Sequence, residues 1–203
     1  MTWLIVTGTD TDVGKTVFAA GLAQALGAAY WKPVQAGLDG GSDSERVSRL
    51  APTARVLPEA HVLQTPCSPH EAARIDGVTI GTLDLPQVAG PLVVEGAGGA
   101  LVPYREDLLA ADLFARWGLP AVIVARTALG TISHTLMTLE VLRSRAIRVA
   151  GVVFVGEAEP VAEGAITRIG GAPHLGRLPW LEPLDARTLA DAFEAHIRMD
   201  LLA

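Results

Sequence analysis

The sequence has a single cysteine, and this scarcity limits its covalent and metal chemistry. Cys67 is alone among 203 residues, so no intrachain disulfide can form, and a reducing compartment fits this composition. It lacks the His and Cys neighbours that a metal site needs. The flanking Pro66 and Pro69 indicate an inert thiol in a packed loop.

Long apolar runs and basic segments are also lacking. No run approaches the ~20 residues of a membrane span, and no basic stretch precedes an apolar one at the N-terminus, as in a signal peptide. The net charge of -6 argues against broad binding to nucleic acid or to an anionic membrane. We therefore expect a cytoplasmic protein with neither nucleic acid nor membrane as a partner, although local positive groups are enough to bind a nucleotide.

No repeat, low-complexity tract or linker divides the chain, so we expect one domain over residues 1–203. Short apolar runs alternate with helical patterns, which is typical of an α/β fold with a mostly parallel sheet flanked by helices. The apolar runs cover residues 3–6, 29–31, 91–95, 121–125, 149–155 and 174–178, and the second leads into residues 32–34, where Pro33 ends the regular ladder. Helical patterns cover residues 18–26, 108–117 and 132–142, and a last one follows Asp185, the expected N-cap. Residues 51–90 show little periodicity.

The first apolar run leads into a loop, residues 8–16 (Gly-Thr-Asp-Thr-Asp-Val-Gly-Lys-Thr), that opens a helical pattern. A buried strand, a glycine-containing loop and a helix start form a phosphate-binding loop, in which backbone N–H groups face the phosphates. Lys15 would span the outer phosphates and Thr16 would bind Mg²⁺. The first glycine, Gly8, stands one residue earlier than in the common pattern. The alternative is an ordinary strand–turn–helix with Lys15 as a solvated surface residue.

Charged residues stand at the ends of two later runs. Lys32 would neutralise charge on a transferring phosphoryl group, or would extend to solvent from the strand end. Glu95 would hold Mg²⁺ beside a glycine-rich stretch, or would be an acid in water at the strand end. Asp43 would reach the same metal–phosphate centre, but it also lies inside a capping box of Ser42 and Glu45 that explains an acid there without any ligand.

Residues 130–134 (Gly-Thr-Ile-Ser-His) open the helical pattern before the fifth run. The free N–H groups of a helix start would accept an anion, such as the carboxylate of a substrate. An ordinary Thr or Ser cap is the alternative.

In six stretches the sequence resembles the dethiobiotin synthetases, ATP-dependent enzymes that close the ureido ring in biotin synthesis. The shifted glycine of the phosphate-binding loop is itself this family's form, and the resemblance covers nearly the whole chain. It implies a fold of the P-loop nucleoside triphosphate hydrolase type. The six stretches are residues 8–16, 32–37 (Lys-Pro-Val-Gln-Ala-Gly), 68–70 (Ser-Pro-His), 94–99 (Val-Glu-Gly-Ala-Gly-Gly), 129–134 and 179–181 (Pro-Trp-Leu).

The resemblance implies a ligase that makes dethiobiotin with Mg²⁺ as cofactor and ATP as co-substrate. In this reaction 7,8-diaminopelargonic acid and CO₂ give a carbamate, which attacks the γ-phosphate of ATP. The second amine then closes the ring on the resulting mixed anhydride and releases phosphate. The resemblance also implies a homodimer with active sites at its interface, because in the family the start of the helix at residues 129–134 of the partner subunit receives the substrate carboxylate.

The implied site residues fall into four groups, which overlap. The catalytic group is Lys15, Lys32 and Thr11. The metal group is Thr16, Asp43 and Glu95. The nucleotide and cofactor group is Asp12, Val13, Gly14, Lys15, Thr16, Val17, Asp43, Glu95, Gly96, Ala97, Gly98, Pro179, Trp180 and Leu181. The substrate group is Thr11, Lys32, Ala36, Gly98, Gly130, Thr131, Ile132 and Ser133.

Three residues depart from the family's pattern. Ala36 stands where a hydroxyl usually faces the substrate, Val155 stands where some members have an Asn that reads adenine, and Asp12 replaces a frequent Glu. A related ATP-dependent amide-forming or carboxylating synthetase is one rival hypothesis. A partitioning or membrane-positioning ATPase is another, but such proteins usually carry a second lysine where Asp10 stands.

Overall fold

A seven-stranded parallel sheet forms the centre of the computed structural model, which describes residues 2–202. The sheet confirms the predicted α/β class. Its strand at the middle, β1, lies between β9 and β6, with all partners parallel. In spatial order the strands are β11 (His174–Leu178), β10 (Val149–Val155), β9 (Ala121–Arg126), β1 (Trp3–Gly8), β6 (Leu92–Gly99), β2 (Ala29–Trp31) and β4 (Arg55–Val56).

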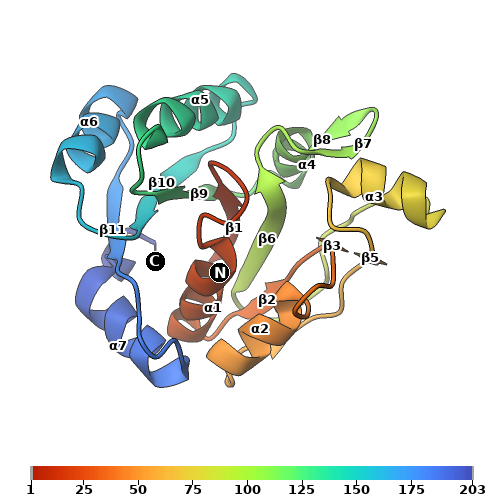
Figure 1. Cartoon of the computed structure of the whole chain (residues 1–203), viewed down its shortest axis with the longest axis horizontal. Helices are drawn as coiled ribbons and strands as arrows, with labels where there is room; N and C mark the ends of the chain where they lie inside the picture. The colour runs from red at the N-terminus through yellow and green to blue at the C-terminus, as the bar shows by residue number, and fades with distance from the viewer. Residues whose placement is uncertain (1, 203) are drawn as a thin grey trace.

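Helices cover both faces of the sheet, because alternate side chains of each strand point to opposite sides. In β1, Leu4 and Val6 pack with α1 (Lys15–Leu26), α2 (Asp43–Leu50) and α7 (Ala186–His196). Ile5 packs on the other face with α4 (Ala110–Trp117), α5 (Thr131–Ser144) and α6 (Pro160–Gly170). Figure 1 shows the two layers of helices on either side of the strands. Within residues 2–202, none of the helices combines the length and the apolar character needed to cross a bilayer.

The predicted elements agree with the structure in the sheet and differ at several boundaries. The strands β10 and β11 have the predicted bounds. The second run ends at Trp31, as the following Pro33 predicted, whereas the pairing of β3 (Val34–Ala36) with β5 (His61–Leu63) in a separate sheet was not predicted. Residues 108–109 form β8 (Leu108–Leu109), paired with β7 (Pro103–Arg105), so α4 begins later than predicted. The helix α6 was not predicted.

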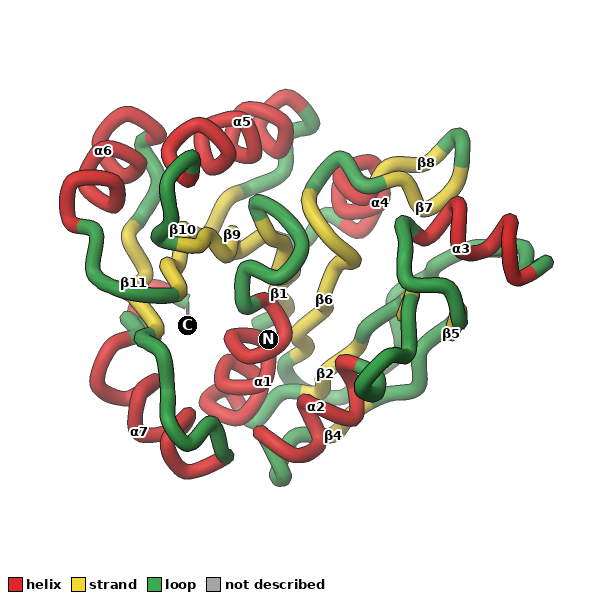
Figure 2. Tube along the Cα trace, viewed as in Figure 1, coloured by secondary structure: helices red, strands yellow, loops and turns green. Residues whose placement is uncertain are grey.

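Residues 51–90 contain β4, β5 and α3 (Pro69–Asp76), followed by an irregular stretch up to β6 (Figure 2). Three indole N–H groups fix this segment to the body of the protein. Trp31 donates to the carbonyl oxygen of Pro58 (3.2 Å), Trp117 to that of Leu83 (2.8 Å) and Trp3 to that of Gly90 (2.9 Å). These contacts come from outside the segment, which explains why its own sequence shows so little pattern.

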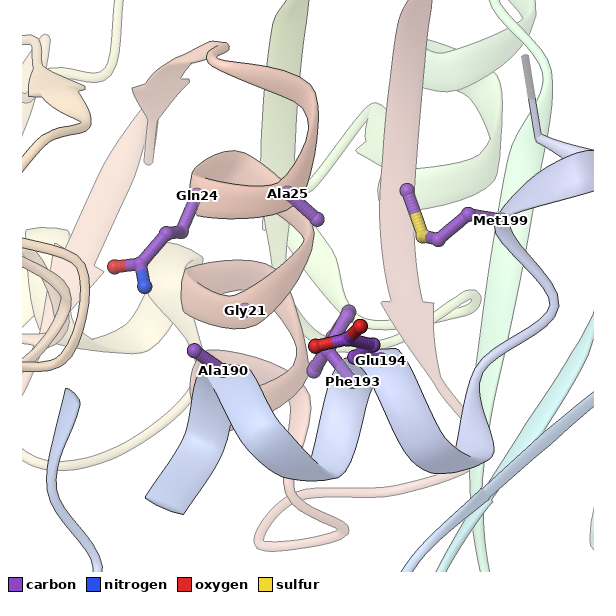
Figure 3. A pocket seen from close by; sticks show the side chains of 7 residues that line it. All are labelled: Gly21, Gln24, Ala25, Ala190, Phe193, Glu194 and Met199. Atoms are coloured by element: carbon purple, nitrogen blue, oxygen red, sulfur yellow. The ribbon is translucent and has the colours of Figure 1, made fainter. Parts of the chain in front are cut away.

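The helix that follows the phosphate-binding loop is held in place by α7. Phe18 and Phe193 stack with ring centroids 5.3 Å apart. A Cβ on Gly21 would lie 2.0 Å from the Phe193 ring, so only glycine allows this approach. The two helices enclose an apolar groove of about 220 Å³, in which Gly21 and Phe193 lie opposite each other (Figure 3). This packing sets the position of the loop at the start of α1.

Candidate active site

A cleft of about 1170 Å³ opens at the carboxyl ends of the sheet strands, where the loops leaving β1, β2, β6 and β11 meet beside Val155, the last residue of β10. Parallel α/β sheets bind their ligands at this edge. Most of the predicted site residues line it: Thr11, Asp12, Gly14, Lys15, Thr16, Val17, Lys32, Ala36, Asp43, Glu95, Ala97, Gly98, Pro179, Trp180 and Leu181. Two predicted residues of the nucleotide group do not line it, because Val13 is buried under the loop and Gly96 is buried within β6.

The loop between β1 and α1 has the backbone of a phosphate-binding loop. Gly14, which precedes α1, has φ +93°, and Asp12 has φ +55°, a conformation that Asp tolerates better than most residues. The early glycine also has a structural reason, since a Cβ at Gly8 would lie 2.7 Å from the carbonyl oxygen of Asp10. The loop therefore folds tightly although Thr9 stands at the usual glycine position.

Lys15 is buried, with 7% of its surface exposed, so the reading of it as a solvated surface residue is wrong. Its Nζ donates to the carbonyl oxygen of Asp10 at 2.8 Å, which curls the side chain back over its own loop. Burial lowers the pKa of the Lys15 ammonium, more than Glu95 raises it. An anion in the cleft would therefore find a partly desolvated cation facing it.

Lys32 stands at the centre of the charged groups, between two carboxylates. Its Nζ contacts Asp43 Oδ2 closely and lies 3.2 Å from Glu95 Oε1. Only 4% of Lys32 is exposed, so it does not extend to solvent. Burial alone would lower the pKa of Lys32, but the carboxylates of Glu95 and Asp43 outweigh burial and hold that pKa above its ordinary value. Lys32 is therefore charged at neutral pH.

Thr16 joins the same centre from the first turn of α1. Its single hydroxyl proton is shared between Asp43 Oδ1 and Glu95 Oε1, each 2.9 Å from Oγ1. Burial would raise the pKa of Asp43, but the charge of Lys32 and hydrogen bonds from Lys32 and Thr16 hold it below its ordinary value. Glu95 is fully buried, so it is not a strand-end acid in water.

The capping box predicted around Asp43 is confirmed, and it does not keep the Asp43 carboxylate away from the cleft. Ser42 and Glu45 make the predicted capping box, with Glu45 N donating to Ser42 Oγ (3.1 Å) and Ser42 N donating to Glu45 Oε2 (2.9 Å). The box aims the start of α2 at the cleft, and this brings the Asp43 carboxylate to Lys32. The cap therefore explains how the Asp43 carboxylate comes to lie beside Lys32.

Two residues of this region, Gln35 and Tyr30, were not predicted as part of the site. Gln35 accepts a hydrogen bond from the backbone N–H of Asp43 (3.1 Å) and donates to the carbonyl oxygen of Gly37 (2.9 Å). The hydroxyl of Tyr30 donates to Glu95 Oε2 (2.8 Å). Gln35 lies inside the 32–37 motif, which signalled it, whereas nothing in the local sequence signals the contact of Tyr30 with a residue 65 positions away.

The oxygens of Thr16, Asp43 and Glu95 form a donor set that fits Mg²⁺, because this ion prefers hard oxygen ligands. Within residues 2–202 no group of three or more His, Cys, Asp or Glu side chains is arranged to hold a metal. Two carboxylates and a hydroxyl suffice for Mg²⁺, which usually keeps several waters and takes other ligands from substrate phosphates.

The exposure of Cys67 differs from the prediction made from its sequence. Cys67 is exposed and lines the cleft, so the expectation of a packed loop is wrong.

The start of α5 does not line the cleft. Its backbone groups at Ile132 and Ser133 donate no hydrogen bond within residues 2–202, whereas Thr131 N donates to Ala128 (3.1 Å) and His134 N to Gly130 (3.2 Å). The predicted substrate residues outside the cleft are Gly130, Thr131, Ile132 and Ser133.

The parallel sheet and its phosphate-binding loop define the chain as a P-loop nucleotide-binding protein. Its fold is similar to that of the cell division ATPase MinD of Pyrococcus furiosus (TM-score 0.53, 14% identity, 96% of this chain and 99% of that one). It is also similar to that of a ParA family ATPase of Chlorobium tepidum (TM-score 0.51, 11% identity, 99% of this chain and 96% of that one). At these identities the likeness concerns the fold alone.

Sequence comparison identifies the family. A family described as an AAA domain matches residues 2–188. The chain is 58% identical to the ATP-dependent dethiobiotin synthetase BioD of Rhodopseudomonas palustris (strain BisB18), over 94% of this chain and 93% of the relative. It is 55% identical to the protein of the same name from Novosphingobium aromaticivorans, over 98% of both chains. The chain belongs to the ATP-dependent dethiobiotin synthetase family, as its motifs predicted.

Proposed function

We propose that this protein makes dethiobiotin from 7,8-diaminopelargonate, CO₂ and ATP, with Mg²⁺ as cofactor, and thereby serves biotin biosynthesis. Sequence identity of 54–58% to proteins named ATP-dependent dethiobiotin synthetase supports the reaction. The observation that carries the assignment of the site is the contact of one buried lysine, Lys32, with two carboxylates beside the phosphate-binding loop. This arrangement provides fixed charge where a phosphoryl group is transferred.

The nucleotide would lie along the loop. The backbone of residues 12–17 faces the phosphates, and Lys15 swings from the carbonyl oxygen of Asp10 to the outer phosphates. When bound, Mg²⁺ supplies positive charge that offsets the charge of the β- and γ-phosphates. Thr16, Asp43 and Glu95 would hold it. The base would lie near Pro179, Trp180 and Leu181, which line the same cleft.

The reaction proceeds in three bond-forming steps. One amine of the substrate adds to CO₂ and loses a proton, which gives a carbamate. A carbamate oxygen forms a bond to the γ-phosphorus as the bond to the bridging oxygen of ADP breaks. The second amine then attacks the carbonyl carbon, loses its proton, and phosphate leaves. Lys15 and Lys32 stabilise the carbamate and the transferring phosphoryl group by charge, so no covalent enzyme intermediate is required.

Contacts with the substrate would come from both ends of the cleft. Thr11 stands beside Gly98, where an added Cβ would lie 3.7 Å from Thr11 Oγ1, and both residues would face the reacting end. Ala36 lines the cleft without a hydroxyl, so one polar contact of the family is absent from this chain.

The remote carboxylate would bind to a second copy of the chain. The free N–H groups of Ile132 and Ser133 suit an anion but do not line the cleft of their own chain. Leu129 is fully exposed beside them, and Met137, also in this region, is 55% exposed. Exposed apolar side chains next to a helix start with free N–H groups support a homodimer in which each α5 completes the partner's site.

Phosphate release measured with each substrate omitted in turn tests the function. Rapid release should require ATP, Mg²⁺, diaminopelargonate and bicarbonate together. Rapid hydrolysis that is indifferent to diaminopelargonate would contradict the proposal and would favour a nucleotide-switched ATPase.

A further inference from the structure

Tyr30 is a buried polar residue that the proposed reaction does not use, yet it contacts the charged centre directly. It lies in β2, level with Val93 of the neighbouring β6, two residues before Glu95. Both Tyr30 and Glu95 are fully buried. The phenol oxygen of Tyr30 lies 2.8 Å from Glu95 Oε2, so the side chain reaches along the sheet to the end of β6.

The two oxygens of Glu95 therefore have different partners. Oε2 accepts from Tyr30 in the interior, while Oε1 faces Thr16 at 2.9 Å and Lys32 at 3.2 Å. Burial, followed by the nearby negative charge of Glu95, raises the pKa of Tyr30 well above its ordinary value, so the phenol keeps its proton. The ring of Tyr30 packs in the apolar cluster that also contains Phe18 and Val47, and this packing fixes the donor in place.

We propose that Tyr30 is a positioning residue whose hydroxyl holds the Glu95 carboxylate so that a single oxygen, Oε1, faces the magnesium–phosphate centre. The inference rests on the magnesium role proposed for Glu95. A carboxylate with one oxygen fixed from behind binds a metal in one geometry, whereas a free carboxylate rotates or turns both oxygens toward Lys32. Outer partners of this kind commonly change metal affinity about 10–100-fold.

Tyr30→Phe removes one oxygen atom and keeps the ring in the core. Its effect is measured directly as Mn²⁺ affinity of the complex with ADP, by electron paramagnetic resonance, and as ADP affinity in EDTA, by calorimetry. Mn²⁺ should bind about 10–100-fold more weakly, while metal-free ADP affinity should stay within about threefold. Tyr104→Phe is the matched control, because Tyr104 is also fully buried but its oxygen accepts from Ala97 N (2.8 Å) instead of binding Glu95. Its Mn²⁺ affinity should stay within about threefold of the wild type.

A double-mutant cycle separates positioning from packing. In a Glu95→Gln background no carboxylate remains to be held, so adding Tyr30→Phe should change Mn²⁺ affinity by less than about threefold. An equal loss in both backgrounds, no loss in the wild-type background, or a Tyr30→Phe protein that does not fold would each overturn the inference. If Glu95→Gln binds Mn²⁺ as the wild type does, the magnesium role of Glu95 fails and the role of Tyr30 fails with it. If Glu95→Gln loses the metal and Tyr30→Phe does not, only the role of Tyr30 is refuted.

Discussion

Replacing Glu95 with Gln removes a charge from the centre of the site and keeps the shape of the side chain. The carboxylate accepts from Tyr30 at 2.8 Å, from Thr16 at 2.9 Å and from Lys32 at 3.2 Å. An amide has one accepting oxygen, so it can keep the contact with Tyr30 only if its NH₂ group turns toward two donors. The substitution therefore breaks contacts on the side that faces the cleft.

The cost in stability is limited by the second acid. Removing one partner of a buried ion pair commonly costs about 3–5 kcal/mol, because the other charge stays buried and unpaired. Here Lys32 keeps its close contact with Asp43. We therefore expect the free energy of unfolding to fall by about 1–3 kcal/mol, the range for a buried donor that loses its hydrogen-bond partner. The variant should remain folded at 25 °C.

The cost in turnover should be much larger than the cost in stability. Loss of a preorganised group that stabilises charge lowers kcat by about 10²–10³, and each tenfold corresponds to about 1.4 kcal/mol. The assay is kcat as a function of Mg²⁺ concentration, with thermal unfolding measured in parallel. Glu163→Gln is the control, since that carboxylate pairs with His174 at 2.9 Å and does not line the cleft. A Glu95→Gln enzyme with near-normal kcat at low Mg²⁺ would refute the metal role.

Three further results are expected. Val155 is 5% exposed and a Cβ on Gly14 would lie 2.9 Å from it, so the Val155 side chain packs on the loop and offers no hydrogen bond to a base. Other nucleoside triphosphates should therefore support turnover within about tenfold of ATP, since one hydrogen bond is worth ~1 kcal/mol. A preference for ATP of several thousandfold would contradict this. Ser133→Pro removes one free N–H in a first helical turn that tolerates proline, so KM for diaminopelargonate should rise about tenfold while ATP affinity stays unchanged. A loss of ATP affinity with an unchanged KM for diaminopelargonate would instead place α5 on the nucleotide. The folded-state pKa of Asp43 lies below its ordinary value of 3.8, so the stability that Asp43 contributes is present above that pH and is lost as the pH falls through the folded-state pKa. The melting temperature should therefore fall more steeply below about pH 4 for the wild type than for Asp43→Asn. Parallel curves for the two proteins would exclude the Lys32–Asp43 pair as the cause.

The sheet was predictable because its strands are nearly continuous apolar runs, as strands buried on both faces must be. The prediction failed where few large side chains are buried. In α6 only Ile166 and Gly170 are buried, so the helix has almost no apolar stripe for a periodic pattern to show. The short helix α3 buries only Pro69, Ala72 and Ala73, which are too small to make a clear pattern.

The candidate site was predictable to the extent that its residues stand at strand ends or in motifs. Lys32 and Glu95 were found because a charge at the end of an apolar run is unusual, and Asp43 because glycines precede it. The contact of Tyr30 with Glu95 joins residues 65 positions apart in neighbouring strands. The sequences of the two strands do not predict that they are neighbours in the sheet. The part of the site that depends on this order therefore required the structure.

We propose that one cleft joins carbon dioxide to diaminopelargonate at the expense of ATP. The most direct measurement follows ¹³C-bicarbonate into product by mass spectrometry, together with ADP release, in the wild type and in Lys32→Met. We expect one labelled carbon in dethiobiotin for each ADP formed, and a loss of both products in the variant. Labelled dethiobiotin formed by Lys32→Met at the wild-type rate, or ADP formed without any labelled product, would refute the proposal.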